Sequence, residues 1–418
     1  MYGSDMARDL GFSRLTISDW RQFHEIDLDL SSRLTIVTGE NGAGKTSVLS
    51  ALGNHFGFAR NLVGTPSRVG NVFAFVAGRR KSRTEDNGFE TFGELTYSSG
   101  ATTKVGVWSH GVGPEFSIAF QTQSPVPGLF LDSHRIVSSY GRVENIPARF
   151  KSASEIMSEY RSQLFFWQGL NAQRKSPSLL MKESLVAAAL YSEGNSAIIA
   201  DPHAAEVWTG FQSVLRILLP QSLSFNRLMI DNAEVLVETD SGTFALEAAS
   251  GGASAIFDLA WQIYLQSRES DSFTVCLDEP ENHLHPSLQR SILPKLLDAF
   301  PKVKFIVATH SPFVVTSSRD ARVHVLRRNA QGRVYSEKLD LKHQALTADE
   351  VLRDVLGVGS TLPLWAESEF DIIMAEFADK PLTTDALQFL ATRLRGAGLR
   401  FSVPEVADTV ARTETEGS

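Results

Sequence analysis

Residues 39–46, GENGAGKT, match the phosphate-binding pattern G-x-x-x-x-G-K-[ST], which constrains the chain more than any other feature. The apolar run 34–37 precedes the loop and a helix-like segment follows it. Glycines let successive backbone N–H groups surround phosphates, Lys45 can neutralise the β and γ oxygens, and the Thr46 hydroxyl can ligate magnesium. The chain is therefore expected to bind ATP with Mg²⁺. The expected nucleotide contacts are Gly39, Glu40, Asn41, Gly42, Ala43, Gly44, Lys45, Thr46 and Ser47.

A second motif, residues 273–280 (FTVCLDEP), is an apolar strand that ends in two adjacent carboxylates. Asp278 is expected to help Thr46 hold magnesium, either through water or from outside the ion's inner ring of ligands. Glu279 is expected to orient and polarise the water that attacks the γ-phosphate. Adjacent carboxylates also occur on solvated turns, but the buried-type strand before this pair and the phosphate loop upstream favour the catalytic interpretation.

A third apolar run, residues 303–308, leads into Thr309-His310-Ser311-Pro312. Ligands of open parallel sheets bind at the carboxyl ends of the strands, so His310 is expected to lie at the ligand edge. An imidazole there can hydrogen-bond a γ-phosphate and report its presence. The alternative is a helix cap made by Ser311 beside an incidental histidine. Because the two other motifs are present, His310 is predicted as a catalytic residue beside Glu279.

Together, the loop at 39–46, residues 278–286 (DEPENHLHP) and residues 308–312 (ATHSP) resemble the ABC-type ATPases of the SMC, RecF and OLD group. The segments 15–23 and 26–30 resemble the opening hairpin of that group. The resemblance implies an α/β P-loop NTPase of ABC type, bilobed, with a mixed sheet core. It extends to stand-alone ATPase subunits of bacterial anti-phage systems of the Septu, retron and PARIS kinds.

In that group, each ATP lies between the phosphate loop of one protomer and a signature motif of the other, which implies a homodimer or higher oligomer. The candidate signature is Ser250, Gly251 and Gly252, directly before an apolar helix. Ala249 and residues 253–254 depart from the group's pattern. The alternative is a flexible turn that only caps the helix. Residues 282–286 occupy the position of the group's D-loop, so His283 and His285 are assigned to it rather than to a zinc site.

Four regions are predicted along the chain. Residues 1–150 form a first lobe with the phosphate loop, in which the apolar run 116–120 is expected to be a strand. Residues 151–220 form a helical insertion, and 221–345 form a second lobe with the signature, the carboxylate pair and His310. Residues 346–418 form a carboxyl-terminal helical extension, with an amphipathic helix expected at 346–356 and a disordered tail at 413–418. The insertion has no sustained heptads, so no long coiled-coil arm is expected. The glutamate and Asp-x-Asp pattern of a Toprim nuclease is absent from 342–418, so no intrinsic nuclease centre is expected.

Bulk properties favour a cytoplasmic protein without a membrane segment. A single cysteine, Cys276, falls within an apolar strand and excludes a disulfide framework. The net charge of −8 argues against a protein that coats nucleic acid. Nucleic-acid contact through local basic patches stays open, with the more frequent alternative of a solvated loop. The patch residues are the cluster 79–83 and, after it, Arg135, Arg142, Arg149 and Lys151.

Three functions are consistent with these features. The leading hypothesis is an ATP-hydrolysing dimer that controls a separate effector protein, a nuclease or toxin, in anti-phage defence. A second is a RecF-like or SMC-like repair ATPase that binds DNA directly. A third is a scaffold that holds ATP as a structural element and turns it over slowly, which Glu279 argues against. The defence role is implied by the family resemblance alone.

Overall fold

The computed structural model describes residues 11–58, 61–69, 72–78, 83–84, 88–108, 113–134, 140–167, 175–194, 196, 198–341, 346–358, 363–377 and 383–398. The basic residues at 79–81, Arg135 and the predicted tail at 413–418 lie outside these ranges. The chain divides into two compact units, Met1–Val351 and Leu352–Ser418. All of the predicted site residues belong to the first unit.

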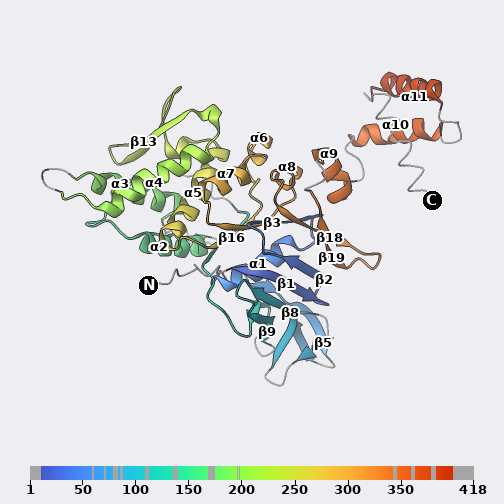
Figure 1. The fold of residues 1–418 in the computed structure, drawn as a ribbon, viewed down its shortest axis with the longest axis horizontal. Coiled ribbons are helices and arrows are strands. Elements are labelled where there is room, and N and C mark those ends of the chain that lie inside the picture. The colour runs from blue at the N-terminus through green and yellow to red at the C-terminus, as the bar shows by residue number, and fades with distance from the viewer. Residues whose placement is uncertain are drawn as a thin grey trace, which may run out of the picture. The chain divides into compact units, whose positions relative to one another are not determined.

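Among the described residues, the largest sheet has twelve strands, and it runs through the middle of the first unit (Figure 1). In spatial order the strands are β11 (Ala119–Phe120), β9 (Thr102–Trp108), β8 (Phe89–Tyr97), β1 (Phe12–Ser18), β2 (Phe23–Asp29), β19 (Val334–Leu339), β18 (Arg322–Arg328), β3 (Leu34–Gly39), β17 (Lys304–Ala308), β16 (Thr274–Asp278) and β12 (Gly128–Leu131), with β7 (Arg83–Thr84) beside β8.

One half of this sheet is parallel and the other half is mostly antiparallel. Strands β12, β16, β17, β3 and β18 are parallel neighbours, whereas β2, β1, β8, β9 and β11 pair antiparallel. Every residue of β3 and β16 is buried, as expected for parallel strands covered on both faces. Strand β1 instead mixes buried and more accessible positions. The predicted α/β class with a mixed sheet core is confirmed.

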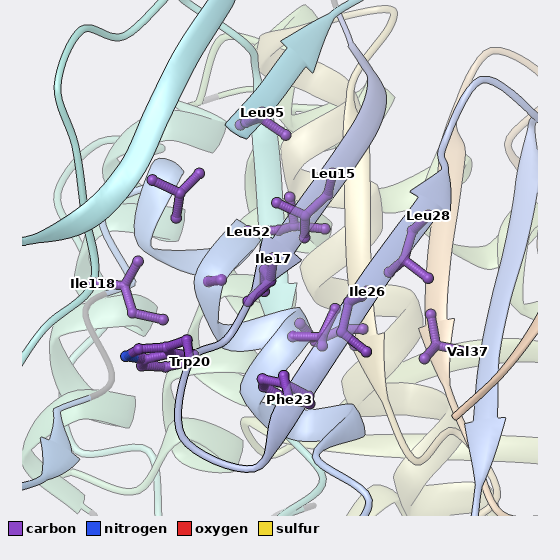
Figure 2. Close-up of a cluster of buried hydrophobic side chains, with 14 of the residues drawn as sticks. Leu15, Ile17, Trp20, Phe23, Ile26, Leu28, Val37, Leu52, Leu95 and Ile118 are labelled. Atoms are coloured by element: carbon purple, nitrogen blue, oxygen red, sulfur yellow. The ribbon is translucent and has the colours of Figure 1, made fainter. Parts of the chain in front are cut away.

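The core beneath the antiparallel half joins the amino-terminal hairpin to helix α1 (Lys45–His55). Figure 2 shows Leu15, Ile17 and Ile26 of the hairpin strands near Leu52 of α1. Trp20, in the hairpin turn, stacks on Phe92 with ring centroids 4.2 Å apart. Burying these large side chains contributes roughly 1.5 to 3 kcal/mol each. The hairpin is thereby fixed against the helix that follows the phosphate loop.

Helices α2 to α5 gather at the end of the first unit beyond β16 (Figure 1). Helix α5 packs against α2 and α4, and α3 packs against α4 and β14. The helices of this unit are α1 (Lys45–His55), α2 (Ala153–Trp167), α3 (Pro177–Ser192), α4 (Pro202–Leu218), α5 (Gly251–Glu269), α6 (Pro286–Gln289), α7 (Ile292–Ala299), α8 (Pro312–Val315) and α9 (Ala348–Glu350), with the short 3-10 helices η2 (Gln221–Leu223) and η3 (Leu246–Ala248).

Small sheets decorate the large one. They are β4 (Leu62–Val63) with β10 (Glu115–Phe116), β5 (Thr65–Val69) with β6 (Val72–Val76), and β13 (Phe225–Asp231) with β14 (Glu234–Thr239) and β15 (Gly242–Ala245). The second unit carries α10 (Leu364–Ala375) and α11 (Thr384–Gly396) around a small apolar core, after the π-helix η4 (Val351–Val355) that spans the boundary. None of the described helices has the length and apolar character that crossing a bilayer requires.

Two local expectations were wrong. The apolar run 116–120 does not form one strand, because Phe116 ends β10 while Phe120 ends β11, and these strands belong to different sheets. Residues 346–356 were expected to form an amphipathic α-helix. Only Ala348–Glu350 is α-helical. Thr347 and Glu350 form a capping box at the start of this helix, and the chain continues as the π-helix η4.

Candidate functional site

The phosphate loop has a backbone that only glycine adopts readily. Gly39, Gly42 and Gly44 have φ angles of +141°, +75° and +98°. A Cβ on Gly39 would lie 2.4 Å from Leu326 O. A Cβ on Gly44 would lie 2.5 Å from Gln22 Nε2. Left-handed backbone and close packing therefore both require glycine at positions 39 and 44, because a side chain would clash there.

Lys45 begins α1 and is buried against the loop it follows. Its Nζ donates hydrogen bonds to Gly39 O at 2.8 Å and to Glu40 O at 3.1 Å. Burial lowers the pKa of Lys45, and the nearby charges of Glu279, Asp278 and Glu281 oppose that shift. The ammonium is thus close enough to these carboxylates to feel their charge, and it lies at the start of a helix, where phosphates bind.

Two polar side chains hold the loop from outside, and sequence reasoning missed both. Gln22 Nε2 donates to Gly42 O at 3.1 Å, and Arg328 Nη2 donates to the same oxygen at 3.0 Å. Gln22 lies in the turn between β1 and β2, and Arg328 is the last residue of β18. Both residues therefore stabilise the backbone of the loop at Gly42, although neither belongs to its motif.

The three motifs meet at one edge of the parallel half-sheet, as the sequence predicts. Asp278 pairs with Ala308 across β16 and β17, and Ala308 pairs with Val37 across β17 and β3. Since these strands are parallel, the residues after Asp278, Ala308 and Val37 all leave the same edge. The carboxylate pair, the segment with His310 and the phosphate loop therefore lie at that edge. Asp278 itself is buried, with 1% of its surface exposed.

Glu279 has a strained backbone and a carboxylate held on both sides. Its φ angle is +47°, which is uncommon for a residue with a side chain. Its N–H donates to Ala308 O at 2.8 Å. Its Oε2 accepts from Asn282 Nδ2 at 3.0 Å, and its Oε1 lies 3.3 Å from His310 Nδ1. The structure thus brings the two predicted catalytic side chains, Glu279 and His310, into contact.

A third carboxylate, Glu281, was not singled out from the sequence. It is 6% exposed, and its Oε1 accepts hydrogen bonds from the Thr309 hydroxyl and from the N–H groups of His310 and Ser311. The available signal was its position two residues after Glu279, in a turn that follows a buried strand. Ser311 also caps α8, its Oγ accepting from Val314 N at 3.4 Å, so the helix cap of the alternative interpretation is present beside the contact between His310 and Glu279.

The candidate signature has a different setting. Ser250 is exposed and caps α5, its Oγ accepting from Ala253 N at 3.4 Å. Gly251 is exposed as well, and neither Gly251 nor Gly252 has a positive φ angle. A Cβ on Gly252 would lie 3.1 Å from His283 O, so this segment packs beside the predicted D-loop. The helix start and the D-loop therefore share one surface.

Four further residues singled out from the sequence have structural contacts. Cys276 is buried in β16, and burial raises the pKa of its thiol. His285 caps α6, its Nδ1 accepting from Ser287 N at 3.3 Å. Arg149 pairs with Glu155 at 2.6 Å, and Lys151 pairs with Glu159 at 2.6 Å. These two ion pairs neutralise part of the predicted basic patch.

The donor chemistry at the edge fits magnesium. Mg²⁺ is commonly bound by one or two carboxylates together with substrate phosphates. Asp278 ends β16 at the edge that the phosphate loop also leaves, and Thr46 stands next to Lys45 at the start of α1. One carboxylate and one hydroxyl are therefore available where phosphate oxygens would complete the coordination.

Comparisons with known proteins agree with this geometry. Residues 131–316 match the family described as "AAA domain, putative AbiEii toxin, Type IV TA system", and residues 14–89 match a family described as "AAA domain". In sequence, the chain is similar to Septu PtuA proteins, to probable ATPases of retrons and to RecF proteins. The resemblance predicted from the motifs is thereby confirmed.

Three relatives illustrate the range. Septu protein PtuA of Bacillus thuringiensis is 25% identical over 36% of this chain and 42% of its own. A retron Vc95 probable ATPase of Vibrio cholerae is 40% identical over 12% of this chain and 10% of its own. The DNA replication and repair protein RecF of Rhizobium leguminosarum is 34% identical over 22% of this chain and 26% of its own. The chain therefore spans less than half the length of each of these relatives.

Proposed function

We propose that this chain binds ATP with Mg²⁺ at the carboxyl edge of the parallel half-sheet and hydrolyses it. The observation that carries the proposal is the contact between Glu279 Oε1 and His310 Nδ1, at 3.3 Å, at the edge where Lys45 is buried. A buried ammonium behind a glycine loop and a carboxylate that can orient water are groups that enzymes of phosphoryl transfer use, and here an imidazole contacts that carboxylate.

The residues divide the chemistry. Lys45 and the N–H groups of the loop bind the β and γ phosphates. Thr46 and Asp278 would hold magnesium, which when bound neutralises charge on the phosphate oxygens. Glu279 accepts a proton from the attacking water while Asn282 and His310 keep its carboxylate in place. His310 faces the position of the γ-phosphate and distinguishes ATP from ADP.

The same proposal includes a homodimer, because the candidate signature is an open helix start. Ser250 and Gly251 are exposed, and the N–H groups at the start of α5 can bind a phosphate that a second copy presents. The similarity to Septu PtuA and to retron ATPases supports an ATPase that controls a separate effector, a nuclease or toxin, in anti-phage defence. We place this activity in the cytoplasm.

The test uses three variants and the wild type. Glu279→Gln keeps the shape of the side chain but cannot accept the proton, so kcat is expected to fall by about 100- to 1000-fold while ATP still binds. Lys45→Ala is expected to weaken ATP binding on the order of 100-fold, or about 2.7 kcal/mol. Glu337→Gln, which changes an exposed carboxylate paired with Arg327, should leave both unchanged. Turnover is measured by phosphate release, and binding by calorimetry.

Dimer formation and partner choice are read from the same proteins. Glu279→Gln with ATP should elute as a dimer by light scattering, and should retain the product of a neighbouring gene when the two are co-expressed. Unchanged turnover in Glu279→Gln would show that another group activates the water.

The similarity to RecF favours one alternative, a repair ATPase that acts on DNA directly. It predicts hydrolysis that rises with added duplex DNA, and DNA binding that weakens as salt is raised. Binding of the Glu279→Gln protein to a labelled duplex, followed from 50 to 200 mM salt by fluorescence anisotropy, separates the two functions. Tight salt-dependent binding without an associated protein would favour the RecF-like role.

A further inference from the structure

Glu281 connects the two loops that carry the predicted catalytic side chains. It lies in the turn after β16, and its Oε1 accepts from Thr309 Oγ1 at 2.6 Å, from His310 N at 3.0 Å and from Ser311 N at 3.2 Å. All three donors belong to the loop after β17. One carboxylate oxygen thus binds three successive residues of the loop that presents His310.

This bond set is sheltered from water. Glu281 is 6% exposed and Thr309 is fully buried. Hydrogen bonds to an ionised carboxylate are roughly twice as strong as those between neutral groups. Breaking them would also take the acceptor from the buried Thr309 hydroxyl, at about 1 to 3 kcal/mol for such a donor. The turn after β16 therefore controls the backbone position of residues 309–311.

The backbone of His310 in turn sets the position of its ring relative to Glu279. His310 Nδ1 lies 3.3 Å from Glu279 Oε1 and 3.8 Å from Glu281 Oε1. The His310 ring is 44% exposed, so little besides these contacts fixes it. A shift of the loop would separate His310 from Glu279, whereas Lys45 is held by a different segment, through Gly39 O and Glu40 O.

We propose that Glu281 is a positioning residue that holds His310 in contact with Glu279. The inference rests on the proposed ATP hydrolysis. Glu281 affects the hydrolysis of the same ATP, and it acts on the chemical step rather than on nucleotide binding. Glu281 touches neither the phosphates nor the water in this role, because it acts through the loop at 309–311.

Four variants test the proposal. Glu281→Ala removes the acceptor, so kcat is expected to fall on the order of 10- to 100-fold while the ATP Kd stays within about 3-fold. Glu281→Gln keeps a carbonyl oxygen for the three donors, and should recover most of the lost kcat. Thr309→Val removes one donor from an isosteric side chain and should give a smaller loss. Glu183→Ala is the control, because Glu183 is a similarly buried glutamate, 8% exposed, on α3.

A double-mutant cycle separates positioning from general damage. In a His310→Ala background, Glu281→Ala should lower kcat little further, because its effect passes through the ring that is already missing. Additive losses, or a Glu281→Ala protein with wild-type kcat, would overturn the proposal. If Glu281→Ala does not fold, the same cycle with Thr309→Val gives the answer.

The result stays interpretable if the proposed function fails. Should the wild type release no phosphate from ATP, ring-labelled histidine NMR still reports the loop. The His310 resonance, assigned by its loss in His310→Ala, should move in Glu281→Ala and stay in place in Glu183→Ala. An unmoved resonance would contradict the positioning role, whatever the enzymatic activity.

Discussion

The two segments predicted to bind the ATP phosphates are built in opposite ways. In the loop at 39–46, Gly39 and Gly44 have left-handed φ angles, their neighbours leave no room for a Cβ, and Lys45 is buried. The candidate signature is an ordinary helix start with exposed Ser250 and Gly251. One chain therefore completes the first segment by itself. The second segment is exposed at Ser250 and Gly251. In the proposed dimer, another copy of the chain supplies the phosphate that it binds.

A buried ion cluster joins the helical insertion to the segment before the signature. Lys182 of α3 is fully buried and pairs with Glu247 at 2.7 Å and also with Glu234. Its Nζ also donates to Gly141 O at 2.9 Å. Burial alone would lower the pKa of Lys182, but the hydrogen bonds that its ammonium donates to the two glutamates raise it, so the side chain stays charged. Glu247 lies in η3, directly before the signature.

A negative charge at the signature should have the largest effect on turnover. Ser250→Asp keeps an N-cap acceptor for α5 but repels a phosphate from a second copy, so turnover should fall on the order of 100- to 1000-fold. ATP binding to the isolated monomer should persist. Thr383→Asp, at the N-cap of α11, is the control. Phosphate release and light scattering with ATP measure both effects, and a dimeric, active Ser250→Asp protein would disprove the role of the signature.

Removing the buried cation should loosen the segment before the signature. Lys182→Met leaves Glu234 and Glu247 without their partner and should lower the free energy of unfolding by about 3 to 5 kcal/mol. Lys302→Ala, which breaks an exposed pair with Asp271, should cost less than about 1 kcal/mol. Urea denaturation measures both. Equal costs would mean that the cluster does not hold α3 to η3.

Matched glycine substitutions test the difference in backbone packing between the two segments, with smaller expected effects on stability. Gly44→Ala places a Cβ 2.5 Å from Gln22 Nε2 at a φ of +98°, so it should cost about 1 to 3 kcal/mol and weaken ATP binding. At Gly251 the nearest atom to a Cβ is His283 Cβ at 4.0 Å, so Gly251→Ala should change stability by about 0.5 kcal/mol or less. Thermal unfolding and calorimetric titration with ATP test the pair. Similar effects at both positions would remove the distinction.

The large sheet also shows which of its features could be predicted from local sequence. The strands before each motif were predictable, because their apolar runs are contiguous and fully buried. Strand β19 pairs with β2, which puts a segment near residue 335 beside the amino-terminal hairpin. A period of two residues indicates which face of a strand is buried but not which strand lies next to it. The predicted division into lobes at residue 150 therefore crosses a single continuous sheet.

The phosphate loop, the carboxylate pair and the location of His310 after an apolar strand follow from the amino-acid sequence alone, because each is a contiguous run whose backbone and chemistry are local. The contacts of Arg328 and Gln22 with Gly42 O, and of Glu281 with the loop at 309–311, depend on the tertiary structure. Those contacts join segments whose proximity depends on strand order and register. A residue's type shows that it can accept or donate a hydrogen bond, whereas the fold decides which partner lies within reach.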